Sequence, residues 1–199
     1  MAENSLIRDY KTRDRKVVVI GGSTGSIDVL LKLVPALQSP LLFALIIVLH
    51  RKNSADSTLA NLLSLKTSIP LREIDDKDIL VPGHIHLVPA DYHLLIEQDG
   101  TCSLDDSEKI NYSRPSIDVT FESAADVYGP SLLGLLLSGA NADGTNGLKA
   151  IKKAGGISVV QKPETAQVGF MPQQAILHAP IDFILDIEEL IDFINSLSH

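Results

Sequence analysis

Three residues with complementary chemistry follow three apolar runs of this sequence: Ser23, His50 and Asp143. A serine hydroxyl can attack a carbonyl carbon, a histidine can take up and return the proton, and an aspartate can orient the imidazole and balance its charge. The apolar runs are typical of buried strands, and the carboxyl ends of parallel strands meet at one edge of a sheet. The sequence therefore predicts that the three side chains gather at that edge as nucleophile, base and orienting acid.

The turn around Ser23 has the pattern Gly21-x-Ser23-x-Gly25, between the strand-forming residues 17–20 and an amphipathic run over 27–37. Strand, sharp turn and helix form the context of a serine nucleophile. Glycine permits the backbone angles of such a turn and lets a substrate approach the main chain closely. The free N–H groups and positive dipole at the start of the helix can stabilise an oxyanion. The order Ser, His, Asp is not the α/β-hydrolase order, so the pattern does not indicate that fold.

Other interpretations of these residues remain open at this point. Glycine-rich turns after strands also bind phosphate or have no ligand, but the first basic residue on the helix side of Ser23 is Lys32 and the P-loop lysine is missing. His84 and His86 would share one strand face near His93, so a metal site is conceivable. No cysteine or close carboxylate set completes it. We therefore expect surface or packing roles for these histidines, and no metal or other cofactor.

The composition is that of a folded protein with a sizeable core. The chain has 199 residues, 45% of them hydrophobic, which suits one domain. A formal net charge of −8 argues against nucleic acid as a partner. No apolar run has the length of a transmembrane helix, and the N-terminal residues lack the apolar core of a signal peptide. The single cysteine, Cys102, fits a reducing compartment. We expect a cytoplasmic protein without membrane insertion.

The order of the apolar runs predicts an α/β fold with a mostly parallel, doubly wound sheet flanked by helices. The expected strands are 17–20, 41–49, 132–137, 157–161 and 183–185; the expected helices are 27–37, 55–65 after a Ser54 cap, 116–128, 145–154 and 187–197, with a short helix that opens at Pro172. Short extended pieces and turn signals near residues 80–106 predict a β-hairpin insertion. Residues 1–16 are polar and charged, so we expect a mobile lead-in before a catalytic domain over 17–199.

Six segments of the sequence occur together, in this order, in one known family: 20–25 (Ile-Gly-Gly-Ser-Thr-Gly), 48–50 (Val-Leu-His), 81–93, 114–118 (Arg-Pro-Ser-Ile-Asp), 138–144 (Ser-Gly-Ala-Asn-Ala-Asp-Gly) and 169–172 (Gly-Phe-Met-Pro). Over nearly its whole length the chain resembles the catalytic domain of the chemotaxis protein-glutamate methylesterase (CheB) family. The resemblance implies that Ser23 is the nucleophile, His50 the base and Asp143 its orienting acid.

Five further residues of these segments are candidates for oxyanion or substrate contacts: Thr24, Gly25, Arg114, Ala140 and Met171. An arginine just before a helix can bind a carboxylate or a carbonyl, although Arg114 could equally be a solvated loop residue.

The resemblance implies the removal of methyl groups from glutamate γ-methyl esters on the cytoplasmic helices of chemoreceptors. Deamidation of receptor glutamine by the same three residues is an alternative, because amide and ester share the acyl-enzyme path. A module that docks on receptors or a signalling complex without catalysis is another. Only sixteen residues precede the first expected strand, so we expect no attached receiver domain, and a separate receiver protein is a possible partner.

Several positions depart from the usual family pattern. Gly22 stands in place of an alanine, Ser26 in place of a glycine, and Arg51 follows the histidine where methionine is typical. Ala140 and Asn141 replace a Met-Gly pair before the aspartate. No member of the expected triad is lost. These substitutions concern the pocket wall, so they bear on substrate preference and rate more than on the chemistry.

Overall fold

The computed structural model describes residues 5–14, 16–51 and 58–198. In this part of the chain, seven strands form one sheet in the order β3-β4-β2-β1-β7-β8-β9, and all neighbours are parallel. These strands are β1 (Val17–Gly22), β2 (Ala44–Leu49), β3 (Leu71–Glu73), β4 (Ile85–Leu87), β7 (Leu132–Leu136), β8 (Ile157–Gln161) and β9 (Phe183–Leu185). A separate antiparallel hairpin consists of β5 (His93–Ile96) and β6 (Cys102–Asp105).

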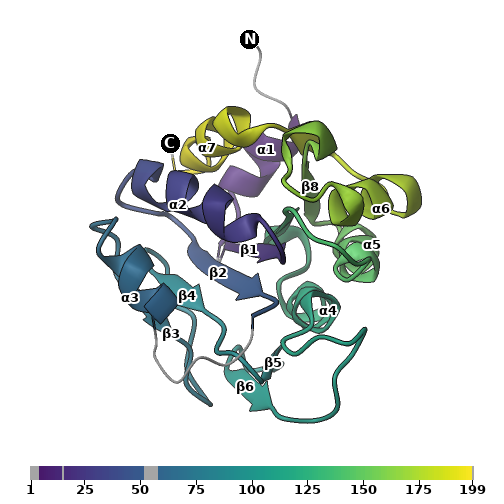
Figure 1. Ribbon diagram of the computed structural model, residues 1–199. Coiled ribbons are helices and arrows are strands. Elements are labelled where there is room, and N and C mark those ends of the chain that lie inside the picture. The colour runs from purple at the N-terminus through teal and green to yellow at the C-terminus, as the bar shows by residue number, and fades with distance from the viewer. Residues whose placement is uncertain (1–4, 15, 52–57, 199) are drawn as a thin grey trace.

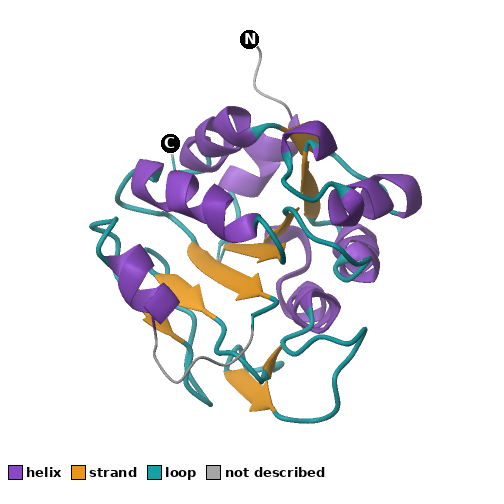
Figure 2. Ribbon diagram, viewed as in Figure 1, coloured by secondary structure: helices purple, strands orange, loops and turns teal. Residues whose placement is uncertain are grey.

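Helices cover both faces of the sheet, as Figure 2 shows, so the predicted doubly wound α/β fold is confirmed. One face packs against α1 (Ser5–Lys11), α2 (Ser26–Ala36), α3 (Thr58–Ser64) and α7 (Ile187–Ser196). The other packs against α4 (Ile117–Tyr128), α5 (Thr145–Lys153), α6 (Phe170–His178) and the β5–β6 hairpin. Two short 3-10 turns, Gly129–Ser131 and Pro163–Thr165, complete the elements.

The continuous apolar runs result from this double cover. In β1, Val18 and Ile20 belong to the core under α2, while Val17 and Val19 belong to the core under α4, and all four are buried. A strand buried on both faces needs apolar side chains at every position and not at alternate ones. The runs in β2 and β7 have the same cause.

The carboxyl ends of the three central strands are held together by backbone hydrogen bonds. The His50 N–H donates to the Gly22 carbonyl (3.0 Å), and the Ser23 N–H donates to the Ser138 carbonyl (2.9 Å). Strand β1 lies between β2 and β7, and the helices that follow β1 and β7, α2 and α5, lie on opposite faces of the sheet (Figure 1). Helices that diverge in this way leave a crevice at the strand ends, which is where ligands bind in open α/β sheets.

The hairpin region differs from the prediction in one strand. Strands β5 and β6 form the expected hairpin, and Figure 2 shows it apart from the main sheet. Strand β4, which we placed in the insertion, instead lies in the main sheet between β2 and β3. The edge strand β3 was not predicted. Three residues carry too little periodicity to identify a strand, and no local pattern names a strand's partner.

The N-terminal prediction was wrong where the structure describes it. Ser5–Lys11 forms α1, with Ile7 and Tyr10 buried in the core under α2 and α7. Most residues of this segment are polar, so the sequence did not reveal that Ile7 and Tyr10 form one apolar face. The expected Ser54 cap lies outside the described residues. Helix α6 begins at Phe170, two residues before the predicted start at Pro172. Pro172 fits inside the first helical turn because the N–H groups of that turn have no partner within the helix, so the N–H that proline lacks is not missed.

Candidate active site

Ser23 occupies the turn between β1 and α2. Its N–H donates to the Ser138 carbonyl beyond the end of β7 (2.9 Å) and to the Ser26 hydroxyl oxygen (3.1 Å). The Ser26 hydroxyl is fully buried and donates to the same Ser138 carbonyl (2.7 Å). Gly25 starts α2 with a φ of 85°, in the left-handed region that favours glycine. These bonds fix the turn against the neighbouring strand end, while the Ser23 side chain stays half-buried.

The loop after β7 approaches this turn closely. A Cβ built on Gly139 would lie 3.0 Å from the Ser23 Cβ and 2.7 Å from the Met171 sulfur, so a side chain there would force Met171 to move. The Met171 N–H donates to the Gly139 carbonyl (2.9 Å), and the Met171 side chain is fully buried. Met171 therefore packs on Gly139 as part of the wall beside Ser23.

His50 follows the last residue of β2, and Asp143 lies in the loop between β7 and α5. The His50 Nε2 lies 2.7 Å from the Asp143 Oδ2. An ionised carboxylate can only accept, so Nε2 carries the proton and Nδ1 is the ring's acceptor. The side chain of His50 is 9% exposed and that of Asp143 is fully buried.

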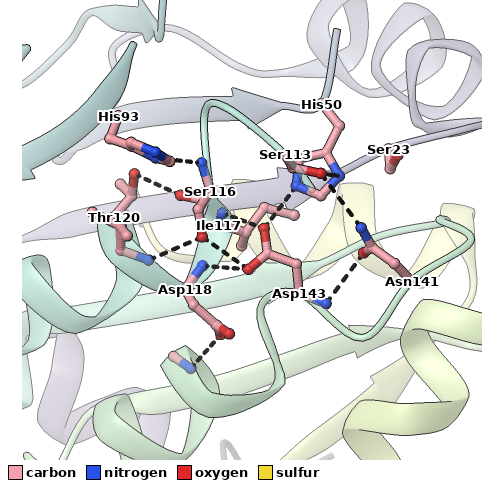
Figure 3. A network of polar contacts seen from close by, with 12 residues as sticks. Ser23, His50, His93, Ser113, Ser116, Ile117, Asp118, Thr120, Asn141 and Asp143 are labelled. Carbon is pink, nitrogen blue, oxygen red and sulfur yellow. Dashed lines mark hydrogen bonds and ion pairs between the residues drawn. The ribbon is translucent and has the colours of Figure 1, made fainter. Parts of the chain in front are cut away.

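The start of α4 supplies the other partners of Asp143, as Figure 3 shows. The carboxylate Oδ2 also accepts from the Ile117 N–H (2.7 Å). The Oδ1 accepts from the Ser116 hydroxyl (3.0 Å) and from the Asp118 N–H (3.1 Å). Both oxygens are thus occupied by donors at a helix N-terminus, which favours negative charge.

These donors decide the ionisation of Asp143. Burial by itself would raise its pKa, but the hydrogen bond from His50 and those from the Ile117 and Asp118 amides outweigh burial, so the pKa lies below the usual value. Asp118 shows the opposite result. Its burial, together with the charge of Asp143, raises its pKa to about 6 even though it accepts from the Gly147 N–H. Of the two carboxyls, Asp143 is therefore the one that is charged beside His50.

The second ring nitrogen of His50 faces a residue that we had not predicted in the site. The Ser113 hydroxyl lies 3.2 Å from Nδ1, and the Asn141 side-chain nitrogen lies 3.5 Å from the Ser113 oxygen. Figure 3 shows Ser23 near the same ring without an interaction drawn to it. In the described part of the chain, no hydrogen bond joins Ser23 to His50. The structure thus links His50 with Asp143 and brings Ser23 to the same strand edge.

The oxyanion candidates lie on two loops that meet at Ser23. Thr24 and Gly25 follow it at the start of α2, and Ala140 follows Gly139 in the facing loop. The backbone N–H groups of Thr24, Gly25 and Ala140 donate no hydrogen bond to another described residue. They are therefore free to donate to an oxyanion, whereas the N–H of Ser23 already donates to Ser138 and Ser26.

A cleft of about 490 Å³ opens beside His50, which is one of its lining residues. Its lining includes Ser113 and two arginines, Arg51 and Arg114. Arg51 forms an ion pair with Glu73 and is therefore held against β3. The cleft gives a side chain that enters from solvent direct access to the His50 ring.

Arg114 has a structural task that the sequence did not suggest. One guanidinium nitrogen donates to the Asp106 and Ser107 carbonyls, the latter at 2.6 Å. Arg114 therefore ties the end of the hairpin region to the start of α4. Its predicted contact with substrate remains a prediction.

The three histidines of the hairpin region do not meet at one point. His86 is buried with its Nε2 near the Val81 backbone, and burial lowers its pKa. His93 accepts from the Ser116 N–H through Nδ1 (3.0 Å) and donates through Nε2 to the Glu108 carbonyl (3.1 Å), so it supports the start of α4. Among the described residues, no group of three or more His, Cys, Asp or Glu could hold a metal ion. In the same part of the chain, no helix could cross a membrane.

One protein family matches almost the whole chain. The family model described as CheB methylesterase covers residues 18–194. A Leptospira interrogans protein, provisionally named protein-glutamate methylesterase/protein-glutamine glutaminase, is 39% identical over 175 residues, which are 88% of this chain and 91% of that protein. A Methanosarcina mazei protein with the same two activities in its name is 32% identical over 189 residues, which cover 92% of this chain and 52% of that protein.

A solved structure agrees with these sequence matches. The crystal structure of the Thermotoga maritima CheB methylesterase catalytic domain superposes with a TM-score of 0.87 at 30% identity, and the match covers 93% of this chain and 100% of the other. Both the sequence and the arrangement of strands around Ser23, His50 and Asp143 thus point to one conclusion. The chain belongs to the CheB methylesterase family.

Proposed function

We propose that this chain hydrolyses γ-glutamyl methyl esters of chemoreceptors, with Ser23 as nucleophile, His50 as base and Asp143 as the residue that orients His50. The observation that carries the proposal is the 2.7 Å hydrogen bond between His50 and Asp143 at the strand edge where the Ser23 turn begins. The names of the relatives, which combine esterase and glutaminase activity, support the choice of a glutamyl ester or amide as substrate.

In the first half of the reaction, the Ser23 oxygen attacks the ester carbonyl carbon, and its proton passes to Nδ1 of His50. The charged Asp143 stabilises the imidazolium that forms. The carbonyl oxygen becomes an oxyanion, and the free N–H groups of Thr24, Gly25 and Ala140 are the donors at hand. Removal of one such donor typically costs about 10²–10³ in kcat.

Collapse of the tetrahedral intermediate breaks the bond to the methoxy oxygen, which leaves as methanol with the proton from His50. A water molecule then gives its proton to His50 and attacks the acyl-enzyme, and glutamate is released as Ser23 recovers its hydrogen. Proton transfer by a positioned base contributes about 10²–10⁴-fold to such steps.

Deamidation of receptor glutamine is the second candidate, and the double names of the relatives favour it. The same acyl-enzyme would form, but ammonia would leave in place of methanol. An amine is a poorer leaving group than methanol, so we expect the ester to react faster when both side chains are offered on the same receptor segment.

The test compares the wild-type protein with Ser23→Ala on a methylated receptor fragment and on its glutamine counterpart, with release of methanol and ammonia as readouts. We expect Ser23→Ala to lose about 10⁴-fold or more of both activities. Ser107→Ala is a matched control, because Ser107 is exposed and, among the described residues, its hydroxyl forms a hydrogen bond only with the Asp105 carboxylate. Unchanged turnover in Ser23→Ala would refute the assignment. A wild-type protein that binds the receptor but releases neither product would indicate a docking module.

A further inference from the structure

The hydroxyl that lies against the base in this structure is that of Ser113. Its oxygen is 3.2 Å from the His50 Nδ1, and it belongs to the loop that precedes α4. Because Nε2 carries its proton toward Asp143, Nδ1 has a lone pair and no hydrogen. The Ser113 O–H is therefore the donor in this contact, and it occupies the only acceptor site of the ring.

Asn141 determines the direction of the Ser113 hydroxyl. The Asp143 N–H donates to the Asn141 side-chain oxygen (3.1 Å), which orients the amide and turns its nitrogen toward Ser113 (3.5 Å). With this donor on its oxygen, Ser113 directs its own proton at His50. The four residues Asn141, Ser113, His50 and Asp143 thus form a closed ring of hydrogen bonds, as the dashed lines in Figure 3 show.

Ser23 is left outside this ring. In the described part of the chain, its hydroxyl has no hydrogen-bond partner, although its turn is bonded through Gly22 to the backbone of His50. Two hydroxyls therefore compete for one lone pair, and only one of them can pass its proton to the ring at a time. The cleft beside the ring is lined by both Ser113 and His50, so a side chain that enters it meets Ser113 next to the base.

We propose that Ser113 is a positioning residue that holds His50 in the resting protein and must yield Nδ1 to Ser23 before the reaction begins. The proposal rests on the proposed function, in which Ser23 and His50 are nucleophile and base. In the free enzyme, Ser23 is therefore activated only when the hydrogen bond between Ser113 and the His50 Nδ1 breaks. A substrate that enters the cleft contacts Ser113 and can displace its hydroxyl from the ring.

The experiment measures how fast a small fluorophosphonate modifies Ser23. In this reaction the Ser23 oxygen bonds to phosphorus, fluoride leaves, and the serine proton passes to His50. We expect Ser113→Ala to react about three- to tenfold faster than wild type, the factor that one neutral hydrogen bond is worth. Ser113→Thr retains the hydroxyl and should restore the wild-type rate, which a loss of packing alone would not predict.

The variants separate failure of this inference from failure of the proposed function. Ser107→Ala, an exposed serine six positions earlier, should label at the wild-type rate. If Ser23→Ala abolishes labelling but Ser113→Ala labels no faster than wild type, the positioning role of Ser113 is refuted and the nucleophile stands. If Ser113→Ala abolishes labelling and Ser23→Ala does not, Ser113 is itself the nucleophile and both proposals fail. Thermal unfolding of each variant checks that the compared proteins are folded.

Discussion

Gly22 and Ser26 show how two single residues depend on each other at the turn that carries Ser23. A Cβ built on Gly22 would lie 2.7 Å from the Ser26 Cβ and closer still to its hydroxyl oxygen. The family pattern described above has the reverse pair, alanine at the first position and glycine at the second. Either pair places one side chain between the strand and the helix, and two side chains do not fit. In this chain the side chain is that of Ser26, whose hydroxyl also bonds the turn to Ser138.

We therefore expect Gly22→Ala to destabilise the protein by about 1–3 kcal/mol, the usual cost of overpacking. The thermal midpoint should fall by about 2–4 °C for each kcal/mol, and ester hydrolysis should fall with it because the Ser23 turn must shift. The double variant Gly22→Ala with Ser26→Gly removes the clash, so it should regain most of the lost stability. The idea of a coupled pair is wrong if the double variant is no more stable than Gly22→Ala alone.

The same scale explains which site residues could be predicted. Ser23, His50 and Asp143 each follow an apolar run, so their residue types and positions at strand ends sufficed to select them as candidates, and their catalytic roles stay a prediction. The contacts of Ser113 and Asn141 with the site depend on how the loop before α4 folds over the strand edge. Nothing in the local sequence encodes that approach, and a serine or asparagine in a loop is ordinary.

At the scale of elements, the amino end of α4 holds the carboxylate of Asp143. Its first amides and the Ser116 cap saturate both oxygens of Asp143, and His93 in turn supports the Ser116 amide. This arrangement forces a second carboxyl, Asp118, into the same buried environment, and its pKa is raised to about 6 by burial and by the charge of Asp143. The start of α4 thus stabilises the charge of Asp143, but it also contains Asp118, whose charged form is destabilised there.

The cost of Asp118 should appear as a pH dependence of stability. Between its unfolded pKa of about 3.9 and its folded pKa of about 6, the folded protein binds more protons than the unfolded chain, so stability falls as pH rises. Asp118→Asn retains an oxygen for the Gly147 N–H but carries no charge. We expect it to match wild type near pH 4 and to exceed it by about 1–2 kcal/mol at pH 8.

Urea unfolding of both proteins across this pH range is the measurement. Asp192→Asn, an exposed position on α7, controls for the loss of one charge and should keep the fall in stability that wild type shows between pH 4 and pH 8. An Asp118→Asn variant whose stability runs parallel to wild type from pH 4 to pH 8 would contradict the buried, destabilising charge.

Element boundaries were predictable where periodicity and end signals agreed. The strands at 157–161 and 183–185 and the helix that Ser116 caps were found as predicted. The place of β4 in the main sheet, beside β2, was missed because pairing is decided by tertiary packing and not by the strand's own residues. Helix α1 was missed because seven residues with two buried side chains give too weak a pattern.

At the scale of the whole molecule, stability and chemistry lie at opposite ends of the strands. Helix α1 packs where β1 begins, since the Tyr10 hydroxyl donates to the Val17 carbonyl (3.1 Å) and its ring is 1% exposed. The site lies where β1 ends, at Gly22, and five residue steps of a strand span about 17 Å. A change at Tyr10 can therefore alter how much protein is folded without touching Ser23, His50 or Asp143.

This separation predicts that Tyr10 variants lose stability but keep their rate constant. Tyr10→Phe removes only the hydrogen bond and should cost about 0.5–1.5 kcal/mol, whereas Tyr10→Ala leaves a cavity in the core on this face of the sheet and should cost about 3–5 kcal/mol. Denaturant unfolding measures both costs, and titration of Ser23 with the fluorophosphonate counts active sites, so that kcat is expressed per folded molecule. A graded loss of stability at constant kcat is expected because the Tyr10 hydroxyl bonds to Val17, at the opposite end of β1 from Ser23. A Tyr10→Ala protein as stable as wild type would show that α1 does not belong to the core.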